Sequence, residues 1–151
     1  MSLNKPREKR GILTGGPSKR DEAVLDSGAV RMDSVVYDFS VEGGAVGTIN
    51  LVRHLPENAM VIGLLTEELT AVTGATDIVI LAGAVALSGS LDLTADAGIQ
   101  SRALAGAVAG IKLSASSELN IAIATNPATA GKVRIYVRYV MPNEQLRGQG
   151  Q

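Results

Sequence analysis

The stretch that decides the fold class is Val133-Arg134-Ile135-Tyr136-Val137-Arg138-Tyr139-Val140. Successive side chains of a β-strand point to opposite faces, so this alternation predicts a strand that is half buried. Val133, Ile135, Val137 and Tyr139 would face a core, and Arg134 and Arg138 would lie on the other face. Residues 119–124 alternate in the same way, and a loop at 125–132 separates the two segments. We therefore expect the two strands to form a hairpin.

Other strand-like segments lie upstream, separated by Gly, Pro and Asn. Residues 35–41, 45–52 and 60–72 have extended patterns, and Tyr37, Phe39 and Val41 of the first would share one face. Residues 77–82 form a continuous β-branched run, which predicts a strand buried on both faces. One or two further strands lie within 84–93, and residues 97–110 fit one short helix. About eight short strands predict an all-β fold, a jelly-roll-like β-sandwich or barrel with an extended N-terminal arm.

The composition suits a single domain with a core of small side chains. The chain has 151 residues, 46% of them hydrophobic but only 3% aromatic, with 17 Gly. One His and no Cys exclude disulfides and a zinc site built from Cys and His. We expect an extended arm at residues 1–34, a β-sandwich domain at 35–141 and a polar tail at 142–151.

The near-neutral net charge of −1 conceals an uneven distribution. Residues 1–20 carry +5, whereas residues 35–110 carry −6. A basic arm of this kind predicts an interaction tail, and we expect it to bind an acidic protein surface. The arm residues predicted to contact this partner are Lys5, Arg7, Lys9, Arg10, Lys19 and Arg20. Arg134 and Arg138 are weaker candidates on the body.

Nucleic acid and membrane are both disfavoured as partners. The arm has no interleaved aromatic residues for base stacking, and no base-reading module is visible. The N-terminus lacks the apolar stretch of a secretory signal. The longest apolar run, residues 103–111, is far shorter than a membrane span. We expect a protein that is made in a cytoplasm and stays soluble.

The residues that could carry catalysis form no recognisable set. His54 is the only histidine, and no Gly-x-Ser-x-Gly elbow accompanies it. Glu67 and Glu68 are adjacent on a strand, so their side chains should point to opposite faces. We expect no enzyme activity.

The residues that could hold a metal or a phosphate are equally incomplete. Asp92, Asp96 and the upstream Asp77 offer oxygen ligands but lack the frame of an EF-hand. The glycine-rich segment 43–47 precedes a strand rather than a helix, and Gly131-Lys132 is followed by Val, so neither is a phosphate loop. We expect no metal and no cofactor.

Three segments resemble the head decoration, or capsid cement, proteins of tailed phages: residues 36–49, residues 55–61 and residues 129–140. The resemblance implies a jelly-roll or barrel-like domain on the outer surface of a virion. It implies a protein that clamps major capsid subunits together, as a dimer or trimer, and attaches after the capsid expands. An active site is not needed for this role.

Two other functions stay open at this point. One is a head- or tail-fibre adhesion domain that binds host glycans. Sugar sites usually present exposed aromatic rings, and most of Tyr37, Phe39, Tyr136 and Tyr139 fall on predicted core faces. The other is a small hydrolase or isomerase, which would need acidic residues converging in a cleft near His54.

Overall fold

The computed structural model describes residues 29–94 and 98–142. Residues 30–141 form one compact unit that is almost entirely β. The strands are β1 (Val30–Asp38), β2 (Gly47–Leu55), β3 (Met60–Thr73), β4 (Ile78–Ala82), β5 (Val85–Ala86), β6 (Gly98–Arg102), β7 (Ile111–Lys112), β8 (Ser117–Ile123) and β9 (Ala130–Val140). The short helix α3 (Phe39–Glu42) follows β1, and a 3-10 turn, η1 (Ala105–Ala107), follows β6.

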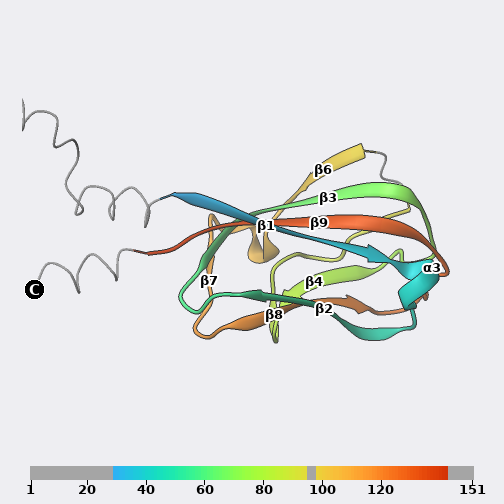
Figure 1. Cartoon of the computed structure of the whole chain (residues 1–151), viewed down its shortest axis with the longest axis horizontal. Coiled ribbons are helices and arrows are strands. Elements are labelled where there is room, and N and C mark those ends of the chain that lie inside the picture. The colour runs from blue at the N-terminus through green and yellow to red at the C-terminus, as the bar shows by residue number, and fades with distance from the viewer. Residues whose placement is uncertain (1–28, 95–97, 143–151) are drawn as a thin grey trace, which may run out of the picture. The chain divides into compact units, whose positions relative to one another are not determined.

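The strands form two antiparallel sheets that pack face to face (Figure 1). One sheet has the order β1-β9-β3-β6, with β7 paired to the start of β3, and is called the five-stranded sheet. The four-stranded sheet has the order β2-β8-β4-β5. Each of the first three connections, β1 to β2, β2 to β3 and β3 to β4, passes from one sheet to the other. This strand order is that of a jelly roll, which confirms the predicted all-β sandwich.

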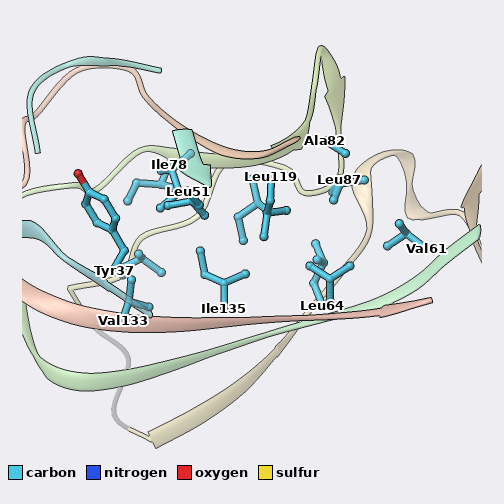
Figure 2. Close-up of a cluster of buried hydrophobic side chains, with 14 of the residues drawn as sticks. Tyr37, Leu51, Val61, Leu64, Ile78, Ala82, Leu87, Leu119, Val133 and Ile135 are labelled. Carbon is cyan, nitrogen blue, oxygen red and sulfur yellow. The ribbon is translucent and has the colours of Figure 1, made fainter. Parts of the chain in front are cut away.

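The core lies between the two sheets and is built from aliphatic side chains on their inner faces (Figure 2). From β9 it receives Val133, Ile135, Val137 and Tyr139, as the alternation predicts. On β4, Ile78, Ile80 and Ala82 are buried, but Val79 and Leu81 between them are only half buried. The prediction that this strand is buried on both faces is therefore wrong. The β-branched Val79 lies on the outer side of β4, which no other layer of the described structure buries completely.

The predicted hairpin of residues 119–124 and 133–140 is also wrong. β8 pairs with β2 and β4, whereas β9 pairs with β1 and β3 in the other sheet. In a hairpin the two apolar faces would lie side by side in one sheet. In the sandwich they lie opposite each other, so Leu119 and Ile135 point into the same core from two layers (Figure 2).

The strand predicted at 35–41 ends early, because the chain turns into α3 at Phe39. Asp38 caps this turn, its carboxylate accepting a hydrogen bond of 2.9 Å from the Ser40 backbone N–H. The Tyr37 hydroxyl lies 2.7 Å from the Gly43 carbonyl oxygen, to which it donates. Burial, reinforced by the nearby Glu42 carboxylate, raises the pKa of Tyr37. Val41 is 80% exposed instead of sharing a core face with Tyr37.

β1 begins at Val30, five residues before the predicted start of the body. Residues 30–34 of the predicted arm pair in register with β9, from Val30 opposite Val140 to Ser34 opposite Tyr136. Val30 and Met32 alternate there with Arg31 and Asp33, but the two apolar residues are exposed and lie on the face opposite to that of the buried Tyr37. The rest of the arm, residues 1–28, lies outside the described residues, as does the tail from residue 143. In residues 97–110 the predicted helix is reduced to η1.

Candidate interaction surface

The six arm residues predicted to bind a partner lie outside the described residues. They are Lys5, Arg7, Lys9, Arg10, Lys19 and Arg20. Their role stays a prediction from the sequence.

The two body residues, Arg134 and Arg138, lie on the face of the five-stranded sheet that points away from the core. They alternate along β9 with buried residues. Cross-strand register places Arg134 opposite Glu67 and Arg138 opposite Gly63 on β3. Directly opposed residues share a face, so β3 and β9 together build this outer face.

Arg134 belongs to a polar cluster with Glu67 and Tyr136. Its Nη1 lies 3.2 Å from Glu67 Oε1, and the Tyr136 hydroxyl donates to the same oxygen at 2.8 Å. The guanidinium also lies 5.9 Å from the centre of the Tyr136 ring. The hydrogen bond to Tyr136, with Glu67 adding to it, raises the pKa of Arg134. At this end of the outer face the charges of Arg134 and Glu67 therefore compensate each other.

Arg138 has a different environment from Arg134. No ion pair or hydrogen bond links its side chain to another residue in the described part of the chain. Its Cδ and Nε lie 3.6 Å from the position that a Cβ on Gly63 would occupy. The missing side chain of Gly63 thus leaves the room in which Arg138 lies across β3.

Between these two cations lies an apolar depression of about 240 Å³. Its walls are Met32 from β1, Tyr136 from β9, Leu65 from β3 and Ile99 from β6. Met32 is 53% exposed and Ile99 58% exposed, which are large fractions for apolar side chains. We call these four residues the outer patch.

Sequence reasoning missed the outer patch because two of its members fall in segments that were not predicted to be strands. Met32 falls in the predicted arm, and Ile99 in the segment read as one short helix. Tyr136 alternates with the core residues of β9, and that alternation was the one signal that could have placed it here.

His54 lies on the exposed side of β2, away from the outer patch. Its Nε2 is 3.2 Å from Glu118 Oε1 on β8, and the Asn50 side-chain amide donates to Glu118 Oε2. Asn50 Oδ1 accepts a 2.7 Å hydrogen bond from the Val52 backbone N–H. The register between β2 and β8 shifts in this segment, and Val52 has a φ of 56°. The cluster closes a β-bulge and holds no nucleophile.

Two of the three carboxylates singled out as metal candidates lie in the described ranges, and both accept hydrogen bonds from nearby residues. Asp92 accepts hydrogen bonds from the backbone and hydroxyl of Thr94, and the side-chain bond is the main cause that lowers the pKa of Asp92. The Ser90 hydroxyl donates to Asp77. Among the residues that the structure describes, no three His, Cys, Asp or Glu side chains gather as metal ligands would. Asp96 lies outside this range.

Glu67 and Glu68 point to opposite faces, as predicted. Glu67 joins the polar cluster on the outer face, whereas Glu68 Oε2 accepts a 3.3 Å hydrogen bond from the Val72 backbone N–H. The two carboxylates therefore share no site.

The glycine-rich segment 43–47 is a connection, as the sequence indicates, whereas Gly131-Lys132 lies within β9 and not in the predicted loop at 125–132. Gly43 ends α3, its N–H donating to the Phe39 carbonyl at 3.2 Å. Gly131 lies at the start of β9, and the adjacent Lys132 lies 3.7 Å from the Asp38 carboxylate.

No helix within residues 29–94 and 98–142 has the length and apolarity to cross a membrane.

The strand order defines the class of fold, a two-sheet jelly-roll β-sandwich. It is similar to a chain of the cyanophage Pam1 capsid asymmetric unit, with 18% identity and a TM-score of 0.56, over 77% of this chain and 87% of that chain.

Two further capsid structures contain similar chains. One is the acidic stable capsid of the Helicobacter pylori bacteriophage KHP30, with 16% identity and a TM-score of 0.51, over 76% of this chain and 89% of that chain. The other is the capsid of Ralstonia phage GP4, with 17% identity and a TM-score of 0.51, over 74% and 85%. No protein-family model and no curated protein matches the chain. At these identities the likeness establishes the fold.

Proposed function

We propose that this chain is a non-enzymatic virion protein that binds the outside of a phage capsid and stabilises contacts between major capsid subunits. The observation that carries the proposal is the likeness of its fold to chains in three phage capsids, each matched over most of its length. The segments that resemble capsid cement proteins fall on β1, α3, β2, β3 and β9 of that same fold.

The physical features of the described body are consistent with a clamp. Two packed sheets resist deformation, so forces between capsid subunits can pass through the body without unfolding it. Among the polar residues considered for catalysis or metal binding, His54, Asp92 and Glu67 are engaged in a bulge, a turn and an ion pair, respectively. The basic arm would contact the major capsid protein, and ordering of an extended arm gives wide contact for few residues. Copies of the chain would associate as dimers or trimers.

The alternative, an adhesion domain for host glycans, has less support. Tyr37, Phe39 and Tyr139 are buried, so Tyr136 is the one aromatic ring partly open to solvent. Its hydroxyl is committed to Glu67. A single ring beside an ion pair offers little of the stacking surface that sugar sites use.

The proposal is tested by mixing the purified full chain with expanded phage heads that lack it. The expected result is co-sedimentation at a fixed copy number per capsid subunit, together with increased resistance of the heads to heat. Saturable binding with no such protection, or no binding, would contradict the proposal.

The arm is tested separately with a chain that starts at residue 29, because residues 30–34 belong to β1 and must be kept. Reversing the charges of Lys5, Arg7, Lys9 and Arg10 should weaken attachment and reduce its dependence on salt. Arg53→Glu, an exposed charge reversal on β2, is the matched control. Attachment that is unchanged by loss of the arm would show that the body alone binds.

A further inference from the structure

Two groups on the outer face of the five-stranded sheet have unused hydrogen-bonding capacity, and they are of opposite charge. Glu67 receives both Arg134 and Tyr136 on Oε1, and no residue in the described ranges bonds to its Oε2. Arg138 has no acidic partner there either. Charged groups left in this state are those that a partner surface can satisfy.

These two groups lie along one strand, on either side of the outer patch. Gly63, Leu65 and Glu67 occupy successive outward positions of β3, and the Arg138 side chain lies over Gly63. With a rise of about 3.4 Å per residue, the positions of Gly63 and Glu67 are about 14 Å apart, and Leu65 is midway. Along β3 the outer face therefore presents a cation, an apolar centre and an ion pair whose carboxylate has one oxygen, Glu67 Oε2, without a bond in the described ranges.

This arrangement is self-complementary. Consider a two-fold axis that lies in the plane of the face and runs at right angles to β3 at Leu65. It places the Arg138 end of one copy against the Glu67 end of the other. We propose that this face binds a second copy of the chain, with the outer patches in contact and Arg138 of each copy against Glu67 of the other. A two-fold interface uses the same patch on both subunits, and it requires this kind of symmetry in the charge pattern.

A second copy fits the face better than an acidic segment of another protein. An acidic segment would satisfy Arg138 but would leave Glu67 beside like charge. In the dimer each Glu67 carboxylate lies between Arg134 of its own chain and Arg138 of the other. The apolar centre, with Met32 and Ile99 more than half exposed, would lose contact with water.

The size of the face sets the expected strength of this contact. Four strands about 4.8 Å apart, with roughly nine residues each, give a footprint of about 600 Å² per copy. The total of about 1,200 Å² lies at the lower end of specific interfaces. The dimer should therefore dissociate on dilution.

The test is sedimentation velocity of the full chain over a wide range of concentration. The wild type should shift from monomer to dimer. Arg138→Glu should weaken dimerisation about tenfold or more, because it faces Glu67 with like charge. Glu67→Arg should do the same, and the double variant Arg138→Glu/Glu67→Arg should restore dimers. Arg53→Glu, a charge reversal on the other sheet, should leave them unchanged.

Ile99→Asn provides a second test, and it adds no charge beside Glu67, which Ile99 opposes in register. This exposed position should accept the change with a wild-type circular dichroism spectrum and a monomeric chain. A wild type that stays monomeric, a dimer indifferent to both single reversals, or a double variant that stays monomeric would overturn the inference.

This inference deepens the proposed function by naming the surface of self-association, and its test needs no capsid. If Arg138→Glu abolished head binding while the wild type was monomeric, the face would bind the capsid and the dimer would be wrong. If the dimer formed as described but heads were not bound, the proposed function would fail and the interface would stand.

Discussion

Gly131 should be among the least replaceable residues of the body. It lies where β9 meets β3, with a φ of 113°, and a Cβ there would be 2.5 Å from Val72 Cα and 2.6 Å from the Ala71 carbonyl oxygen. Both neighbours are backbone atoms, so no side-chain rotation relieves the overlap. Gly131→Ala must therefore separate two central strands as well as adopt a backbone conformation that L-residues avoid.

Substitutions at two other glycines separate the two contributions to this loss of stability, backbone strain and steric overlap. Gly43 has a φ of 97° but nothing within 4 Å of its added Cβ, so Gly43→Ala reports backbone strain alone, about 1–3 kcal/mol. Gly89 has neither a positive φ nor a neighbour within 4 Å, so Gly89→Ala should be neutral or stabilise by about 0.5 kcal/mol. Gly131→Ala adds a backbone overlap to the strain, and we expect it to cost about 4 kcal/mol or more.

The three variants are compared by urea and thermal unfolding followed by far-ultraviolet circular dichroism, since the chain has no Trp. At about 2–4 °C per kcal/mol, Gly131→Ala should lower Tm by about 8–16 °C. A loss for Gly131→Ala equal to that for Gly43→Ala would refute the overlap. A large loss for Gly89→Ala would refute the assignment of open space at that position.

Further predictions concern the core, a buried hydroxyl and a turn. Ile121→Ala on β8 should lower the free energy of unfolding in urea by about 3–4 kcal/mol, because removal of the fully buried side chain leaves a cavity. The control Val46→Ala, at an exposed position, should lower it by less than about 0.5 kcal/mol. Equal losses would contradict the placement of Ile121 in the core. Tyr37→Phe removes the donor that closes α3 and should cost about 1 kcal/mol, more than Tyr139→Phe in the same assay, and the reverse order would contradict the turn. The folded-state pKa of Asp92 is lowered, so its contribution is present above the unfolded pKa and is lost as pH falls through the folded one. Asp92→Asn should therefore flatten the acid limb of a Tm-against-pH profile, and an unchanged limb would contradict this.

The sequence predicted the orientation of side chains correctly where a strand has one buried face and one solvent-exposed face. Along β9 the alternation correctly predicted the buried residues and placed Arg134 and Arg138 on the opposite face. It failed at β1, an edge strand whose first apolar residues, Val30 and Met32, lie on the exposed face. The prediction of a continuous strand also failed after Asp38. There the Asp38 cap and the hydrogen bond from the Tyr37 hydroxyl to Gly43 stabilise the helical turn α3.

The candidate surface was visible only in part. Two outward arginines could be read from the strand pattern, but the outer patch joins residues from four strands that are distant in sequence. Met32 and Ile99 have no local signal, since an exposed apolar residue in a loop-like segment resembles many others. Their proximity follows from the register of β1, β9, β3 and β6.

By itself the sequence determined the all-β class and the inward face of the long strands, because side-chain alternation with a period of two is a local property of the backbone. The tertiary structure alone decided which strands pair. β8 and β9 follow each other in the chain and have matching apolar faces, yet they lie in different sheets. A sandwich removes both apolar faces from water by placing them opposite each other, and a lone hairpin cannot do this. The partners of a strand are thus set by the closure of the whole core, which no short segment encodes.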